Sequence, residues 1–187
     1  MLRLDVVIAS TRPGRVGKAV ADWFYPVARE HGAFDARLVD LAEMNLPLLD
    51  EPNHPRMQKY QHEHTRRWAE TVDAADAFVF VVPEYNFGPT PALTNALNYL
   101  YLEWNYKAAG FVSYGGVSGG LRSVQATKPL LTTLKIMPLV EQVMVPMVNQ
   151  HLKDGVFESN DHHRDSAQAM LDELERWAGA LKPLRAS

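Results

Sequence analysis

The sequence predicts a doubly wound α/β domain, in which a parallel sheet carries helices on both faces. Three observations favour this fold. Apolar runs of strand length alternate along the chain with segments whose apolar residues recur at helical spacing. The most apolar run, residues 77–82, is hydrophobic on both faces, as expected for a central parallel strand. No repeat, low-complexity tract or long linker interrupts the 187 residues, so we expect a single domain over residues 1–187.

Five apolar segments predict the strands of this sheet. They are short, rich in β-branched, aromatic or other apolar residues, and bounded by glycine, proline or polar residues. The predicted strands cover residues 4–9, 34–41, 77–82, 108–114 and 139–148. Pro146 interrupts the last of them, because proline has no N–H group to donate to a sheet.

Five helices are expected after these strands. In the first helix Val20, Phe24 and Val27 recur at helical spacing, and Gly32 ends the helix. The predicted helices cover residues 17–31, 61–75, 91–100, 120–134 and 165–181. The alternation of strands and helices indicates a parallel sheet, because parallel neighbours are joined by crossover connections. The segment over residues 45–55 contains too many prolines for regular structure, and loops of that length are often functional.

Three chemically rich loops follow the first, third and fourth strands. They cover residues 10–17, 83–91 and 113–120. Parallel strands end at the same edge of a sheet, and ligands bind there at the switch in strand order. We therefore expect the three loops to converge on one site.

The first loop predicts an anion site. It joins a strand to a helix N-terminus, where unpaired backbone N–H groups and the helix dipole favour negative charge. Ser10, Thr11, Arg12 and Arg15 add hydroxyl and guanidinium donors. The glycines match neither the P-loop nor the G-x-G-x-x-G pattern, so the loop suits a terminal monophosphate better than a pyrophosphate.

The second loop predicts a flat apolar binding surface. It has the sequence Pro83-Glu-Tyr-Asn-Phe-Gly-Pro-Thr-Pro91, and its prolines favour a rigid backbone. Tyr85 and Phe87 offer apolar walls that suit a planar heterocycle. The alternative is a turn whose aromatic rings pack into the core.

The third loop allows two interpretations. Four glycines among its last six residues let a ligand approach the backbone closely. The same residues match G-x-S-x-G, the nucleophile elbow of α/β-hydrolases, with Ser118 as the nucleophile. A triad would also need a carboxylate and a histidine, for which the candidates are Asp154 or Asp161 and His162 or His163. That hydrolase interpretation leaves the anion loop without a role.

Composition excludes several classes of function. Nineteen basic and twenty-two acidic residues give a formal net charge of -3 without blocks of like charge, which argues against nucleic acid as a partner. There is no cysteine, so thiol redox chemistry is excluded and any redox reaction needs a bound cofactor. No apolar run approaches the ~18 residues of a membrane span, and no signal peptide is evident. We expect a cytoplasmic protein.

Taken together, the three loops resemble the flavin-binding loops of the NADPH-dependent FMN reductase family, whose fold is flavodoxin-like. The likeness covers nearly the whole chain and includes Leu46-Pro-Leu-Leu-Asp-Glu-Pro52 and Trp104-Asn-Tyr-Lys107. It implies a five-stranded flavodoxin-like sheet and a set of FMN-binding residues. That set is Ser10, Arg12, Arg15, Val16, Gly17, Pro83, Glu84, Tyr85, Asn86, Phe87, Ser113, Tyr114, Gly115 and Gly116.

The resemblance also implies a reaction. FMN would take hydride from NADPH or NADH and pass it to a small-molecule acceptor such as free flavin, a quinone, an azo compound or a metal oxyanion. No side chain need act as a nucleophile or strong base, so no catalytic residue is named. Many members carry serine or threonine where this chain has Val16 and Gly17, and Arg15 is expected to compensate for the missing hydroxyl. A flavodoxin-type electron carrier is the remaining alternative.

Two further predictions concern surfaces. The helical segment over residues 91–102 is apolar on more faces than one sheet contact requires, which favours a homodimer or homotetramer, with Trp104 and Tyr106 near a site across the interface. The alternative is a helix buried within one chain. The histidines of His62-Glu-His64 and His162-His163 lack metal-site spacing, so they are predicted to be surface residues and no metal is expected.

Overall fold

A five-stranded parallel sheet forms the centre of the protein. The computed structural model describes residues 1–185. Its strands lie in the order β2-β1-β3-β4-β5, which confirms the predicted doubly wound sheet. The bounds are β1 (Leu2–Ile8), β2 (Phe34–Asp40), β3 (Ala77–Pro83), β4 (Lys107–Tyr114) and β5 (Ile136–Val145). The chain runs from β1 outward to β2 and then returns to β3 on the other side, so the strand order switches between β1 and β3.

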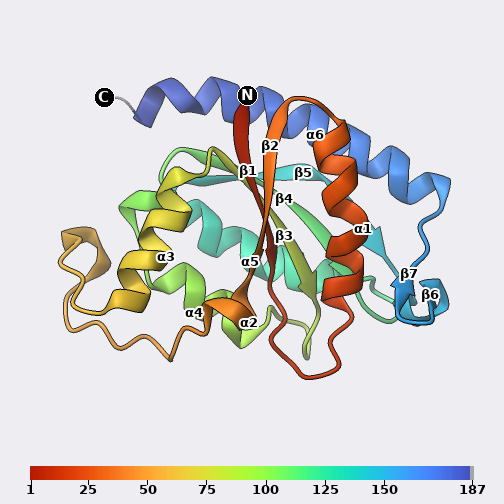
Figure 1. Ribbon diagram of the computed structural model, residues 1–187, viewed down its shortest axis with the longest axis horizontal. Coiled ribbons are helices and arrows are strands. Elements are labelled where there is room, and N and C mark those ends of the chain that lie inside the picture. Colours follow the sequence, from red (N-terminus) through yellow and green to blue (C-terminus); the bar gives the residue numbers. More distant parts are fainter. Residues whose placement is uncertain (186–187) are drawn as a thin grey trace.

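Helices cover both faces of the sheet (Figure 1). One face carries α1 (Gly17–Glu30) and α6 (Asp161–Leu181). The other carries α3 (Glu63–Ala74), α4 (Pro91–Asn98) and α5 (Leu121–Thr133). None of the helices within residues 1–185 is both long enough and apolar enough to cross a membrane.

The two cores follow from strand periodicity. Alternate residues of a strand point to opposite faces, so the odd and even positions of β3 enter different cores. Val79 and Val81 pack with α1 and α6, whereas Phe78 and Phe80 pack with α3, α4 and α5. All seven residues of β3 are buried, which confirms the prediction of a central strand.

The boundaries of β5 and α6 differ from the predicted ones. β5 ends at Val145, directly before Pro146, and begins three residues earlier than expected, with Pro138 in the strand. The strand tolerates Pro138 because β5 is an edge strand and its pairing with β4 shifts register there. α6 begins at Asp161 rather than residue 165, because Asn160 caps it in a reciprocal capping box with His163.

Short elements escaped sequence prediction. They are α2 (Leu41–Met44), the hairpin of β6 (Leu152–Lys153) and β7 (Val156–Phe157), and 3-10 turns at Pro55–Met57, Leu102–Trp104, Val148–His151 and Lys182–Arg185. Elements of two to four residues contain too few positions to show a period. The proline-rich segment predicted over residues 45–55 lies outside helices and strands as far as residue 54, whereas Pro55 begins a 3-10 turn.

Most of the apolar residues predicted to form a dimer surface lie inside one chain. Leu93, Leu97, Tyr99 and Leu100 are at most 1 % exposed, whereas Tyr101 is only partly buried and Leu102, at the end of the segment, is 41 % exposed. Trp104 is fully buried and packs against Trp68 and Phe78, with ring centroids 5.8 and 5.0 Å away. The prediction that Trp104 reaches a site across an interface is therefore wrong, because its indole fills the core beneath α3 and α4.

Candidate functional site

The three loops converge at the carboxyl ends of β1, β3 and β4. In Figure 1 the loop between β1 and α1 extends beyond this edge of the sheet. A cavity of about 260 Å³ lies among the loops. It is lined by Ser10, Arg12, Arg15, Val16, Pro83, Glu84, Tyr85, Tyr114, Gly115, Val148 and Asn149. The position matches the switch in strand order, where ligands of doubly wound sheets bind.

Five predicted site residues lie at the margin of this cavity instead of lining it. Asn86, Phe87 and Gly116 are exposed at the rim. Gly17 lies behind the wall, at the first position of α1. Ser113 is fully buried, and its hydroxyl has no hydrogen-bond partner within the described residues.

Arg15 shapes the first loop from within. Its guanidinium pairs with both carboxylate oxygens of Asp40, at the end of β2, and it also donates to the Ser10 carbonyl at 2.6 Å. Asp40 in turn caps α2 by accepting from the Ala42 N–H at 2.9 Å. The hydrogen bond with Asp40 raises the pKa of Arg15, despite an opposing effect of burial. The charge that the sequence assigns to the phosphate is therefore already paired with a carboxylate.

Arg12 is the free cation of the first loop. Its side chain is exposed, lines the cavity and has no hydrogen-bond or ion-pair partner within residues 1–185. Ser10 lies nearby, and its hydroxyl is 3.0 Å from the hydroxyl of Tyr85 in the second loop. The first helix offers further donors, since no side chain caps its N-terminus. This end of the cavity is suited to an anion.

The second loop turns sharply at Asn86 and Phe87. Tyr85 and Gly88 exchange two backbone hydrogen bonds, at 3.0 and 2.9 Å. Asn86 and Phe87 both have positive φ, 50° and 71°, as the central residues of a type I′ turn require. This backbone is uncommon for phenylalanine, and such strain is often found at functional sites. The turn leaves the Phe87 ring 67 % exposed beside the cavity.

Glu84 joins the second loop to the third. Its carboxylate accepts from the Ser118 hydroxyl at 2.7 Å, the Arg122 Nε at 2.6 Å and the Arg122 backbone N–H at 3.2 Å. Burial alone would raise the pKa of Glu84, but these hydrogen bonds outweigh it and lower the pKa. The Arg122 guanidinium also lies 3.7 Å from the centroid of the Phe87 ring. We call this cluster of Glu84, Phe87, Ser118 and Arg122 the loop clamp.

These contacts contradict the hydrolase interpretation. Ser118 donates its proton to Glu84 rather than to a histidine. His163 is 2 % exposed, and its Nδ1 accepts from the Asn160 N–H at 3.3 Å as part of the α6 cap. Burial lowers the pKa of His163 to about 4, so it is a weak base at neutral pH. The prediction that His163 lies on the surface is also wrong, because its ring packs beside Trp23.

The other predicted histidine pair lies away from the cavity. His62 and His64 stack with ring centroids 5.1 Å apart, and both are partly exposed. His64 Nε2 is 2.9 Å from Asp50 Oδ1, which also accepts from the Tyr99 hydroxyl at 3.0 Å. Within the described part of the chain, no group of three or more histidine, cysteine or acidic residues is placed to hold a metal.

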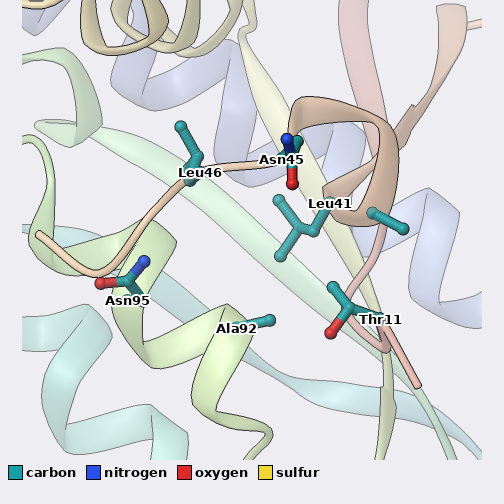
Figure 2. A pocket seen from close by; sticks show the side chains of 7 residues that line it. Thr11, Leu41, Asn45, Leu46, Ala92 and Asn95 are labelled. Atoms are coloured by element: carbon teal, nitrogen blue, oxygen red, sulfur yellow. The ribbon is translucent and has the colours of Figure 1, made fainter.

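A second cavity involves the first loop through Thr11 (Figure 2). Its volume is about 250 Å³, and it is lined by Thr11, Leu41, Ala42, Asn45, Leu46, Ala92 and Asn95. Thr11 therefore belongs to this neighbouring space and not to the cavity of Arg12. The lining contains no charged side chain, and the Asn95 amide is already bonded to the Pro47 carbonyl and the Leu49 N–H.

The residues of the first cavity fit FMN. A free guanidinium and uncapped helix amides suit the phosphate, and the apolar and peptide surface of the second loop suits a planar ring. The third loop packs tightly against the end of β4. Gly120 has a φ of 82°, and a Cβ there would lie 2.8 Å from the Tyr114 nitrogen, so the position has no room for a side chain.

Sequence reasoning missed several residues of the site. Asn149 and Val148 follow β5, whose carboxyl end meets the same edge of the sheet, so topology could have indicated them. Asp40 affects the site by pairing with Arg15, and Arg122 affects it by pairing with Glu84. No motif marks them, since each is defined by its partner in space.

Known proteins resemble this chain over most of its length. A family model described as NADPH-dependent FMN reductase matches residues 2–150. An NAD(P)H-dependent FMN reductase from Nectria sp. is 31 % identical over 167 residues, covering 83 % of each chain. One from Schizosaccharomyces pombe is 42 % identical over 120 residues, covering 63 % of this chain and 60 % of that one.

Solved structures confirm the flavodoxin-like fold. The flavoenzyme NAD(P)H:(acceptor) oxidoreductase FerB from Paracoccus denitrificans has a TM-score of 0.77 at 16 % identity, covering 97 % of this chain and 99 % of that one. A WrbA-like flavodoxin from Agrobacterium tumefaciens has a TM-score of 0.62 at 18 % identity, with the same coverage. By its family match and its relatives, the chain belongs to the NADPH-dependent FMN reductase family and is an FMN- and NAD(P)H-dependent oxidoreductase.

Proposed function

We propose that the three-loop cavity binds FMN and that the protein uses it to reduce a small-molecule acceptor with NADPH or NADH. One observation carries the assignment to this cavity: the Arg12 side chain, which has no hydrogen-bond or ion-pair partner within residues 1–185, lines the same cavity as Val16, the N-cap residue of α1, and the loops after β3 and β4. Bound FMN would supply the centre that accepts and releases hydride. Free flavin, quinones, azo compounds and metal oxyanions remain the candidate acceptors.

The proposed contacts divide the site into two ends. Ser10, Arg12, Val16 and Gly17 surround the phosphate through side chains and helix amides, and Arg15 holds the loop in shape. The ring end uses mainly backbone groups and apolar surface. Its proposed residues are Pro83, Glu84, Tyr85, Asn86 and Phe87 from the second loop and Ser113, Gly115 and Gly116 from the third, and Tyr114 also lines the cavity.

The chain's own residues contribute position and electrostatics. The one carboxylate in the cavity wall, Glu84, is held by Ser118 and Arg122, so it is not available as a general base. Burial raises the pKa of Tyr114, which keeps its phenol protonated at neutral pH. The proposed site therefore binds and orients the reactants without a catalytic acid or base.

The test is a visible spectrum of the purified protein after FMN is added and unbound flavin is removed by desalting. We expect retained flavin that bleaches when NADPH is added without oxygen. Arg12→Ala should retain much less flavin than Arg29→Ala, a matched change on the far end of α1. Equal retention in the two variants would contradict the assignment of FMN to this cavity. An electron carrier would retain flavin but fail to oxidise NADPH.

Three predictions from the sequence belong to this proposal. They are a cytoplasmic location, a homodimer or homotetramer, and a single domain over residues 1–187, of which residues 186–187 lie outside the described part. Size-exclusion chromatography with light scattering would measure the oligomeric state directly.

A further inference from the structure

Gly17, the first residue of α1, lies against the hydroxyl of Tyr114. A Cβ added at Gly17 would lie 2.5 Å from the Tyr114 phenolic oxygen and 3.3 Å from its Cζ. Real Cβ atoms do not approach an oxygen so closely, so no side chain fits at position 17 beside this phenol. The space that a side chain at position 17 would need is therefore filled by the phenol of Tyr114, at the end of β4.

The Tyr114 hydroxyl lies where an anion ligand is expected. The residue is 5 % exposed, and it lines the same cavity as Ser10, Arg12 and Val16. The neighbouring helix N-terminus has no side-chain cap, so its first amide groups have no acceptor within the helix. A buried phenol thus brings an O–H group to the open end of a helix from a different strand.

The protonation state of Tyr114 suits a donor. Burial raises its pKa, and the nearby Tyr85 raises it further, whereas Ser10, Arg12 and Arg15 oppose the shift. The phenol therefore keeps its proton at neutral pH. A hydrogen bond from a neutral hydroxyl to an ionised oxygen is stronger than one between neutral groups.

We infer that the Tyr114 hydroxyl donates a hydrogen bond to the FMN phosphate, taking the place of a hydroxyl side chain at the start of α1. The inference rests on the proposed FMN site and adds a phosphate ligand from β4. It assigns to Tyr114 a hydroxyl donor beside the start of α1, where no side chain caps the helix and Arg15 is already paired with Asp40. Tyr114 is thus a ligand of the phosphate rather than a wall of the ring.

The test compares Tyr114→Phe with the unchanged protein for two ligands, FMN and riboflavin, which differ by the phosphate. Flavin fluorescence gives the Kd of each. We expect Tyr114→Phe to weaken FMN binding about tenfold or more, since hydrogen bonds to charged groups are the strong ones. Riboflavin binding should change less than about twofold. Tyr25→Phe, on α1 but outside the cavity, is the control and should change neither.

The outcomes separate this inference from the proposed function. If the unchanged protein binds neither flavin, the FMN site itself is wrong. If it binds FMN and Tyr114→Phe weakens FMN and riboflavin equally, or neither, the phosphate role of Tyr114 is overturned.

A swap of the hydroxyl sharpens the test. Gly17→Ser alone should weaken FMN binding, because its Cβ meets the phenolic oxygen. In Gly17→Ser with Tyr114→Phe the oxygen is gone and Cζ needs to move by only a few tenths of an ångström. The double variant should bind FMN better than either single variant, which is a coupling between residues in contact. Additive losses would show that the two positions do not share a ligand role.

Discussion

The first loop and the loop clamp differ in whether their charged side chains are paired. The clamp neutralises its carboxylate, since Glu84 is bonded to Ser118 and Arg122 and leaves no free charge beside the ring end of the cavity. The first loop contains two arginines and pairs only one of them within residues 1–185: Arg15 is held by Asp40, and the Arg12 side chain has no partner there. An unpaired cation is thus kept for the ligand at one end, while structural ion pairs stiffen the backbone at both ends.

The largest loss of stability is expected from a substitution at Arg15. Arg15→Ala leaves Asp40 nearly buried without its partner, which should lower the free energy of unfolding by about 3 kcal/mol. Urea denaturation with constant m-value measures the loss. Arg15→Ala combined with Asp40→Ala should be less destabilised than the sum of the two single variants. A change in the single variant as small as that of Lys18→Ala would show that the pair does not hold the loop.

In contrast to Arg15, Arg12 should contribute little to stability and more to FMN binding. Arg12→Ala removes an exposed side chain without a partner, so the free energy of unfolding should change by less than about 0.5 kcal/mol. The Kd for FMN should rise about tenfold, or about 1.4 kcal/mol, because a charge-assisted contact to phosphate is lost. Isothermal titration with FMN and thermal unfolding of the ligand-free protein give both values. If Arg12→Ala lowered stability and FMN affinity together, Arg12 and Arg15 would not have separate roles.

The loop clamp should yield a smaller effect. Arg122→Ala removes the partner that covers Glu84 and Phe87, and we expect a loss of about 1 kcal/mol in stability. Hydrogen exchange should increase locally over residues 84–88 and 116–121, because the clamp joins these segments. Arg176→Ala, which removes an exposed pair on α6, serves as the control. Unchanged exchange in both loops would mean that the clamp does not stiffen them.

The smallest effect is a dependence of stability on pH. The pKa of Glu84 is lowered in the folded protein, so its contribution is present above its unfolded pKa of about 4.5 and is lost as pH falls through the folded value. As the pH falls below about 4.5, the free energy of unfolding should therefore decrease by about 0.5 kcal/mol less in Glu84→Gln than in the unchanged protein. The effect is modest because the clamp is partly open to solvent. Identical acid slopes in the two proteins would contradict this contribution.

Much of the fold was predictable because strands and helices are indicated by patterns among residues close together in the sequence. The five parallel strands and five long helices follow from apolar periodicity, with boundaries that shift by a few residues at caps and prolines. The apolar residues around Trp104 were misassigned, since their periodicity cannot tell a core from an interface. Only packing against Trp68 and Phe78 decided that they are core.

The sequence by itself determined the order of elements and the three polar loops at one edge of the sheet. The tertiary structure decided which polar groups in those loops are free. Arg15 and Asp40 are 25 positions apart, and Glu84 and Arg122 are 38 positions apart. Local patterns depend on neighbours a few residues away, whereas ion pairs and the contact of Gly17 with Tyr114 depend on how the strands are ordered in space.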